Sequence, residues 1–284
     1  MITESVSVTA RDGLSLAGLL LRPDTAPQRA MVMNPALGVP KEFYRRFAER
    51  AVEDGSVVLL YDYRGIAGSR PSSLRGFPAT MRDMGIHDIA GAIDFLTQRF
   101  PDLPLVGAGH SAGGQLLGLA DNHARLTRYV MIACSTGTLK LMPWPFRWFA
   151  NVMMYAFIPL VTRTLGYAPS RAVGWGEDLP AGVAREWADW CKDDRYLAGY
   201  FGRTITREFY DDIRMPILAF AMSDDPIANP RSVPALLSLF RNASVETRWI
   251  TPHSLNTKKL GHLGYFTSRG KAAWDQAFAF LHAK

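Results

Sequence analysis

A serine stands alone among residues with little or no side chain in the stretch GAGHSAGGQ, at positions 107–115. The apolar run 103–107 predicts the end of a buried strand and residues 113–120 predict a helix, so Ser111 falls on the turn between them. So sharp a turn strains its central residue, and a side chain at either flanking glycine would collide with it. The G-x-S-x-G pattern indicates a nucleophilic serine, although a glycine-rich turn without chemistry could show the same pattern.

A serine hydroxyl is a weak nucleophile at neutral pH, so it needs a base to take its proton and an acid to orient that base. The predicted strand 217–222 runs into Asp224 and Asp225, which places two carboxylates at the same edge of the sheet as Ser111. Asp225 is the preferred acid because Pro226 follows it and fixes the loop, and Asp224 stays open as the alternative. Turn formation or helix capping is the non-catalytic interpretation of this pair.

Six histidines are candidates for the base. His262 lies in a loop before the last predicted helix, and the glycines beside it would let its ring reach Ser111 while Nδ1 faces the aspartate. His253 directly follows a predicted strand and stays open as the alternative, whereas His110, next to the serine, should point away from it. With His262 as the base, the order along the chain is Ser, Asp, His, as expected for this motif.

The elements that must position these residues are predicted from the hydrophobic pattern. Two alternating runs, 6–10 and 14–21, are joined by Asp12 and Gly13 and predict a β-hairpin. Short apolar runs then alternate with amphipathic helices, which predicts an α/β fold with a mainly parallel sheet flanked by helices on both faces. The predicted strands are 30–35, 56–63, 103–110, 128–135, 215–225 and 244–251, and the predicted helices are 42–55, 84–100, 112–124, 233–240 and 271–284.

Composition excludes several other classes of function. The chain has 284 residues, of which 48% are hydrophobic, and its 32 Lys and Arg residues are scattered among 26 Asp and Glu residues, so we expect no nucleic-acid partner. Cys134 and Cys191 lie far apart and outside any Cys/His cluster, and no G-x-G-x-x-G opens the first βαβ unit, so we expect neither a metal nor a nucleotide cofactor. The first residues include Glu4 and no apolar signal core, which indicates a cytoplasmic protein.

Four stretches carry a resemblance to a known family: FAERAVEDGSVVLLYDYRGIAGSRP, GHSAGG, SDDPIA and LGHLGYF. With them the chain resembles an α/β-hydrolase over nearly its full length, and it is similar to predicted hydrolases grouped with serine aminopeptidase-like and monoacylglycerol-lipase-like proteins. Residues 62–65 resemble the D-x-R-G-x-G-x-S turn of such proteins, with Ala67 where glycine is usual and Gly68 one place later.

The resemblance also implies an oxyanion hole, in which one donor is the amide of Ala112 and the other comes from the loop after the predicted strand 30–35. That loop reads Asn-Pro-Ala-Leu-Gly, and proline has no N–H, so Ala36 or Leu37 must supply the second donor. Ala36 is preferred.

The resemblance further implies that the interruption at 138–212 is a helical cap, or lid, inserted into a hydrolase core made of 1–137 and 213–284. The insertion is rich in Trp, Phe, Met and Tyr, which favours an apolar substrate group, although these residues could simply form the cap's own core. Its longest uncharged stretch, 148–162, is broken by Pro159 and is too short for a transmembrane helix. Loose attachment to a membrane surface and self-association through this face both stay open.

These observations predict a serine hydrolase that cleaves a small-molecule substrate, an ester, thioester or amide that carries an apolar acyl or leaving group. Ser111 would attack, His262 would act as the base and Asp225 would orient it, with no cofactor. The same fold also supports acyl transfer, cofactor-free chemistry or ligand binding without turnover, and the sequence does not separate these.

Overall fold

The apolar runs of the sequence form one eight-stranded sheet with the strand order β1-β2-β4-β3-β5-β6-β9-β10. The computed structural model describes residues 1–283. Strand β2 runs antiparallel to both of its neighbours, and the other neighbouring pairs from β4 to β10 are parallel, which confirms the predicted α/β fold class. The strands are β1 (Ile2–Thr9), β2 (Ser15–Arg22), β3 (Arg29–Asn34), β4 (Ser56–Tyr61), β5 (Leu105–His110), β6 (Leu126–Ile132), β9 (Ile217–Met222) and β10 (Val245–Ile250).

Strands β1 and β2 form the predicted hairpin. Their register pairs Thr9 with Ser15, and Gly13 in the connecting turn has a φ of +87°. That backbone conformation is in the left-handed region, which glycine adopts without a steric penalty, so the Asp-Gly dipeptide explains the turn.

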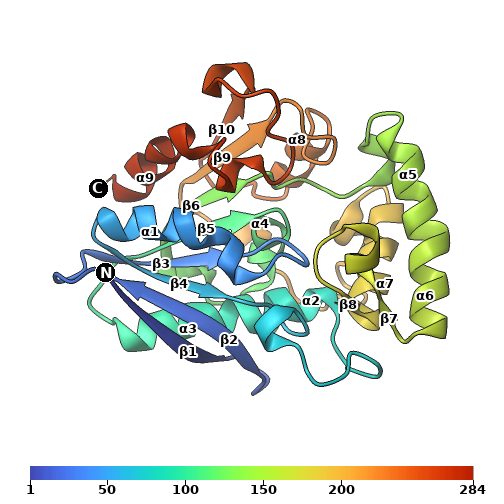
Figure 1. Cartoon of the computed structure of the whole chain (residues 1–284), viewed down its shortest axis with the longest axis horizontal. Coiled ribbons are helices and arrows are strands. Elements are labelled where there is room, and N and C mark those ends of the chain that lie inside the picture. The colour runs from blue at the N-terminus through green and yellow to red at the C-terminus, as the bar shows by residue number, and fades with distance from the viewer. Residues whose placement is uncertain (284) are drawn as a thin grey trace.

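Helices cover both faces of the sheet (Figure 1). Helices α1 and α9 share a core with one face, where Phe47 and Phe278 pack beside Val58 and Val106. Helix α3 and the turns around α4 cover the opposite face, where Ile93 belongs to the other core cluster. Outside residues 138–212, the α-helices are α1 (Arg45–Glu53), α2 (Met81–Asp83), α3 (Ala90–Arg99), α4 (Ala112–Gln115), α8 (Ser232–Leu237) and α9 (Trp274–His282).

The helix predicted at 112–124 is much shorter in the structure. Helix α4 ends at Gln115, and a 3-10 turn (Leu116–Leu119) follows. The sequence here has three glycines within seven residues, and each glycine lowers helix stability by roughly 1 kcal/mol relative to alanine. The glycines are needed for packing, since a Cβ on Gly118 would lie 2.4 Å from a ring atom of Tyr210.

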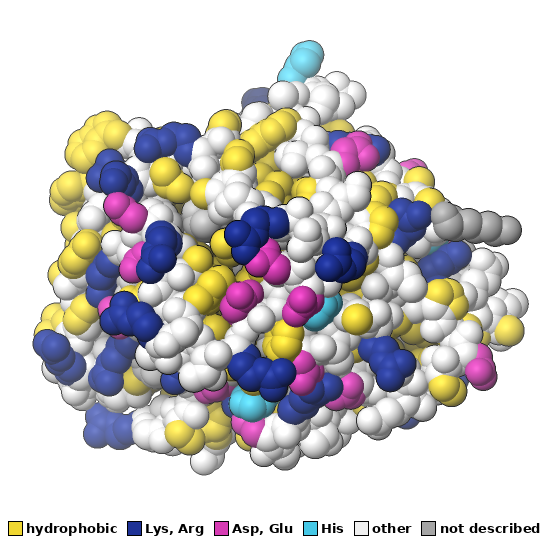
Figure 2. Space-filling view, turned by 180° about the vertical axis from the view of Figure 1, so that it is seen from behind, with side chains coloured by type: hydrophobic (Ala, Val, Ile, Leu, Met, Phe, Trp, Pro, Cys, Tyr) yellow, Lys and Arg dark blue, Asp and Glu magenta, His cyan; other side chains and the backbone are white. Residues whose placement is uncertain are grey.

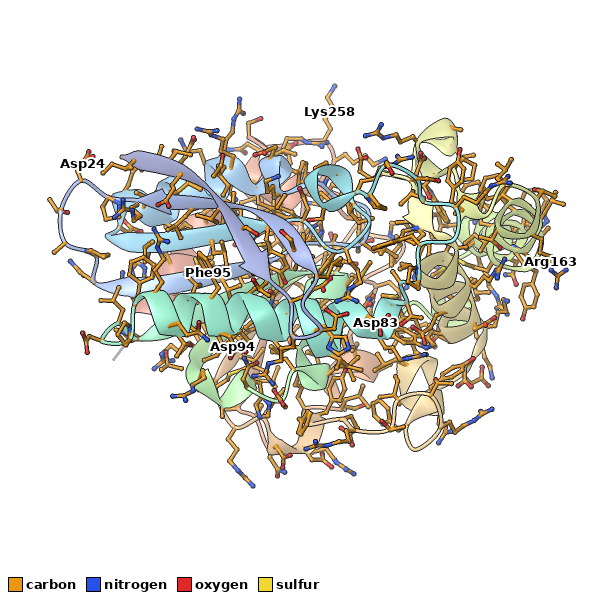
Figure 3. All side chains as sticks on the ribbon, turned by 90° about the horizontal axis from the view of Figure 1, so that it is seen from below. Asp24, Asp83, Asp94, Phe95, Arg163 and Lys258 are labelled. Atoms are coloured by element: carbon orange, nitrogen blue, oxygen red, sulfur yellow. The ribbon has the colours of Figure 1, made fainter. Side chains whose placement is uncertain are left out.

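Residues 138–212 lie at one end of the sheet and contain α5 (Phe146–Val152), α6 (Ile158–Thr164), α7 (Ala181–Lys192) and the short strands β7 (Tyr167–Ala168) and β8 (Leu179–Pro180) (Figure 1). The outer surface of α5 and α6 exposes Trp148 and Leu160, and Arg163 points away from the body of the molecule at this edge (Figure 3). Figure 2, in which this segment lies at the left, shows hydrophobic side chains among basic ones along the same edge. Within residues 1–283, no helix is long and apolar enough to cross a membrane.

Candidate active site

Ser111 occupies the turn between β5 and α4 with φ of 50° and ψ of −111°, a strained conformation for a residue with a side chain. The turn is also crowded by its neighbours. A Cβ on Gly109 would lie 2.3 Å from the hydroxyl oxygen of Tyr129, and a Cβ on Gly113 would lie 2.1 Å from the carbonyl oxygen of Asn34. These contacts explain why the serine has glycine two positions before it and two positions after it.

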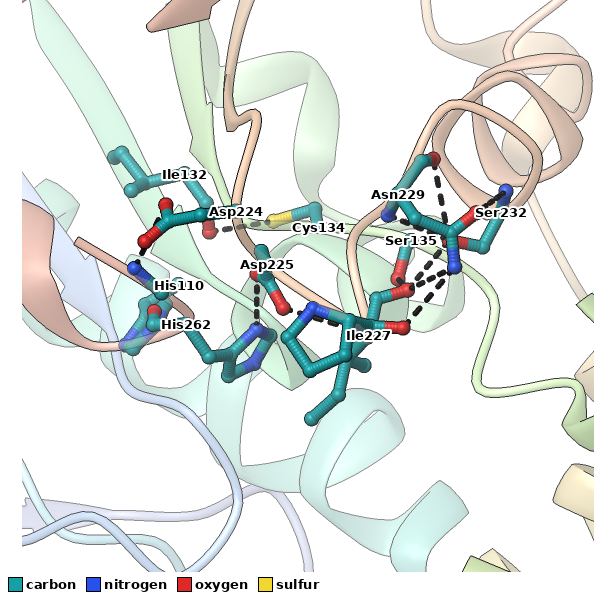
Figure 4. Close-up of polar contacts among 12 residues, drawn as sticks. His110, Ile132, Cys134, Ser135, Asp224, Asp225, Ile227, Asn229, Ser232 and His262 are labelled. Carbon is teal, nitrogen blue, oxygen red and sulfur yellow. Dashed lines mark hydrogen bonds and ion pairs between the residues drawn. The ribbon is translucent and has the colours of Figure 1, made fainter. Parts of the chain in front are cut away.

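His262 and Asp225 are joined by a hydrogen bond of 2.6 Å between Nδ1 and Oδ2 (Figure 4). His262 lies in the loop between β10 and α9, and Asp225 lies just after β9, so the contact joins residues at the carboxyl end of the sheet. Oδ1 of Asp225 accepts the N–H of Ile227 at 2.8 Å. Burial alone would raise the pKa of Asp225, but the interaction with His262 and the backbone N–H donors outweighs burial and lowers this pKa below its ordinary value.

Asp224 contacts the backbone of the histidine loop and not the imidazole ring. Its two carboxylate oxygens accept the N–H groups of Leu260 and Gly261 at 2.9 and 3.0 Å. The two adjacent aspartates therefore have different roles, since Asp225 faces the ring of His262 and Asp224 fixes the loop that carries it. The alternative base, His253, is exposed on a 3-10 turn.

Ser111 and His262 line the same cavity, which has a volume of about 310 Å³. Its walls are predominantly apolar, and about half of the lining residues come from residues 138–212. The contributors from that segment are Met142, Phe146, Ala150, Met154, Gly174, Trp175, Gly176, Leu179, Trp187 and Cys191. Gln115, a polar residue of the wall, has its amide engaged with the carbonyl of Ser135 and the hydroxyl of Tyr196.

Ala112 and Leu37 line this cavity, and their backbone N–H groups have no acceptor within residues 1–283. The N–H of Ala36 instead donates to the buried hydroxyl of Tyr44 at 2.8 Å. This finding is at odds with the preference for Ala36 as the second oxyanion donor. The sequence shows that Pro35 lacks an N–H. It does not show that the Ala36 N–H is taken by Tyr44, which lies at the end of the 3-10 turn before α1.

The loop that carries Ala36 and Leu37 is also anchored at its far end. Asp62, after β4, accepts the backbone N–H of Lys41 at 2.7 Å and the N–H of Gly68 at 3.0 Å, and it pairs with the Lys41 ammonium. Ala67 adopts a φ of +41°, so the D-x-R-G turn closes even though alanine stands where glycine is usual. Arg64 of the same turn forms ion pairs with Asp88 and Asp12.

His110 and Tyr44 are site residues that the sequence reasoning did not assign. Both are buried, and they are joined by a hydrogen bond of 2.9 Å between the Tyr44 hydroxyl and His110 Nδ1. Burial, helped by the nearby His262, lowers the pKa of His110 to about 3. Strand alternation was the available signal, because it places position 110 on the same face as Val106 and Ala108, which is the face that α1 covers.

Within residues 1–283, no group of three or more His, Cys, Asp or Glu side chains is arranged to hold a metal ion.

Comparison with known proteins is consistent with this architecture. A family model described as the alpha/beta hydrolase family matches residues 34–274. Among solved structures, the chain is similar to a lipase in its open form, with a TM-score of 0.68 at 19% identity, covering 99% of this chain and 98% of the lipase. An esterase of Pyrococcus furiosus gives a TM-score of 0.66 at 16% identity, covering 99% of this chain and 90% of the esterase. An esterase from Exiguobacterium antarcticum gives a TM-score of 0.61 at 13% identity, covering 99% of this chain and 100% of the esterase. At these identities the solved structures show a shared fold.

Proposed function

Because the chain belongs to the alpha/beta hydrolase family, we propose that it is a serine hydrolase that cleaves an ester, thioester or amide with an apolar acyl or leaving group. One observation carries the proposal: the imidazole of His262 is bonded to buried Asp225 at 2.6 Å and lines the same cavity as the strained Ser111. A buried carboxylate on one side of an imidazole and a strained serine at the same cavity are what nucleophilic acyl chemistry requires.

The reaction follows from the hydrogen-bond directions. Asp225 is ionised, so Nδ1 of His262 carries the proton between them and Nε2 is free to accept the proton of Ser111. The serine Oγ attacks the substrate carbonyl, and the protonated His262 then gives its proton to the leaving group. Water, deprotonated by the same histidine, cleaves the resulting acyl-enzyme and restores the serine.

The negative charge that develops on the carbonyl oxygen needs donors that are not already engaged. We assign this role to the N–H groups of Ala112 and Leu37. Both residues line the cavity, and neither N–H has an acceptor within residues 1–283, whereas that of Ala36 is bonded to Tyr44. Preorganised donors of this kind are each worth about 10²- to 10³-fold in kcat.

The apolar part of the substrate is assigned to the wall formed by residues 138–212, which we propose is a cap inserted into a core made of 1–137 and 213–284. Met154 and Trp187 are on its inner side, where they line the cavity. An apolar acyl chain or leaving group would gain roughly 0.8 kcal/mol for each methylene that it buries there. A cytoplasmic location is part of the same proposal, supported by the two free buried cysteines, Cys134 and Cys191.

The test is labelling with a fluorophosphonate, followed by mass measurement of the adduct, in the parent and in Ser111→Ala and His262→Ala. We expect one adduct on Ser111 of the parent and no adduct on either variant. p-Nitrophenyl esters of increasing chain length then measure the depth of the apolar pocket, and added alcohol or amine acceptors distinguish hydrolysis from acyl transfer. A folded parent that reacts with neither the probe nor any ester would contradict the proposal.

A further inference from the structure

A continuous chain of buried hydrogen bonds joins the two loops that meet at the cavity. The N–H of Ala36 donates to the Tyr44 hydroxyl at 2.8 Å, and that hydroxyl lies 2.9 Å from Nδ1 of His110. The opposite ring nitrogen of His110, Nε2, lies 2.9 Å from the backbone carbonyl oxygen of His262. The chain therefore runs from the residue before Leu37 to the backbone of His262 itself.

The chemistry of the end groups fixes the direction of every bond. A carbonyl oxygen only accepts, so Nε2 of His110 must donate its proton to His262. His110 is neutral at physiological pH, since burial lowers its pKa to about 3, and its Nδ1 is therefore an acceptor. The hydroxyl of Tyr44 accepts from the Ala36 N–H and donates to that Nδ1. With His110 neutral, no other arrangement of protons satisfies all three hydrogen bonds.

The side chains of Tyr44 and His110, which form these hydrogen bonds, are also fixed by packing. Tyr44 and His110 are 1% and 0% exposed, and the Phe266 ring contacts both, with ring centroids 4.8 Å from Tyr44 and 4.9 Å from His110. Phe266 follows His262 by four residues, so the same loop that carries the histidine closes over the chain. A movement of either end would leave a buried polar group without a partner, which is costly inside a protein.

We propose that Tyr44 and His110 are positioning residues, which hold the loop of Leu37 and the backbone of His262 in a fixed relation so that the oxyanion donor and the base meet the substrate at Ser111 together. This inference rests on the proposed hydrolase function. Neither residue touches the substrate: Ser111, Leu37 and His262 line the cavity, and Tyr44 and His110 lie behind them. His110 occupies the position before Ser111, so one short segment at the end of β5 carries both the serine and one of the two positioning residues.

The main experiment compares Tyr44→Phe with Tyr265→Phe. Tyr265 is a control because it is equally buried and its hydroxyl donates to the backbone carbonyl of Ala273. That bond is not part of the hydrogen-bond network of Tyr44 and His110. We expect Tyr44→Phe to lower kcat and the rate of fluorophosphonate labelling by about 10- to 100-fold, with KM within about twofold of the parent, because sub-ångström misalignment is felt mainly in the transition state. Tyr265→Phe should leave kcat unchanged, with a smaller loss in Tm, because its hydroxyl makes one hydrogen bond of 3.4 Å where that of Tyr44 makes two shorter ones.

A second pair of variants separates positioning from packing. Glutamine at 110 has a carbonyl that can accept from Tyr44 and an amide that can donate to His262, whereas leucine can do neither. His110→Gln should therefore retain much more of the parental kcat than His110→Leu. If Tyr44→Phe and His110→Leu keep the parental kcat while Tm falls, or if Tyr265→Phe loses kcat equally, the positioning role is wrong.

The ring nitrogens of His110 give a readout that is independent of turnover. Long-range ¹H–¹⁵N spectra of the parent should show a neutral imidazole with its proton on Nε2 from pH 8 to pH 5. A proton on Nδ1, or an imidazolium in this range, would overturn the bond directions given above. A parent that shows the expected tautomer but never reacts at Ser111 would refute the proposed function, and with it the positioning role of Tyr44 and His110.

Discussion

Replacing the two adjacent aspartates one at a time tests whether they have the different roles that their hydrogen bonds indicate. In Asp225→Asn, the amide oxygen is expected to stay on the Ile227 N–H, where Oδ1 accepts at 2.8 Å, which leaves the NH₂ group facing Nδ1 of His262 in place of the carboxylate oxygen at 2.6 Å. Two donors cannot face each other, so His262 must move its proton to Nε2. In that tautomer the ring cannot accept the proton of Ser111.

The expected loss in kcat is about 10⁴-fold, because the wrong tautomer removes base catalysis while the oxyanion donors and the cavity remain. The carboxylate of Asp224, by contrast, accepts the N–H groups of Leu260 and Gly261. Asp224→Asn keeps one oxygen, so only one of these two N–H groups loses its acceptor. That change should lower the free energy of unfolding by about 1–3 kcal/mol and kcat by about tenfold or less.

The assay is steady-state hydrolysis of a p-nitrophenyl ester between pH 5 and 9, together with urea unfolding of each variant. The reverse order, with Asp224→Asn nearly inactive and Asp225→Asn nearly wild type in kcat, would refute the reasoning from the hydrogen-bond geometry. Equal losses in both variants with equal loss of stability would show that the loop, and not the orientation of the ring, controls the rate.

Three further outcomes are expected. The pKa of His110 is about 3 in the folded protein and about 6.5 when unfolded, so between these values the unfolded state binds an extra proton. The free energy of unfolding should therefore be highest above pH 6.5 and fall by up to about 1.4 kcal/mol per pH unit down to pH 3. In urea unfolding, His110→Gln should lack this part of the pH dependence. Met154→Trp should shift ester preference to shorter chains, measured as kcat/KM across the series, while Tyr155→Trp, next to it on the exposed side, should not. Gly109→Ala should lower the free energy of unfolding by about 1–3 kcal/mol and abolish labelling, since its Cβ would meet Tyr129, and an unchanged denaturant midpoint with intact labelling would contradict this.

The sequence by itself determined the features that depend on local rules. The Asp-Gly hairpin, the buried runs of a mainly parallel sheet and the sharp turn at Ser111 follow from periodicity and from the absence of side chains at the flanking glycines. The sequence also indicated which edge of the sheet would carry the chemistry, because parallel strands place their carboxyl ends together.

The tertiary structure alone decided which hydrogen-bonding groups face one another. Asp224 and Asp225 are neighbours on one loop, and only the final position of His262 shows which of them contacts its ring. Likewise, nothing near Ala36 in the sequence shows that Tyr44 takes its N–H. Hydrogen bonds depend on distances of a few tenths of an ångström between segments far apart in the chain, and these distances are set when the helices and loops pack on the sheet.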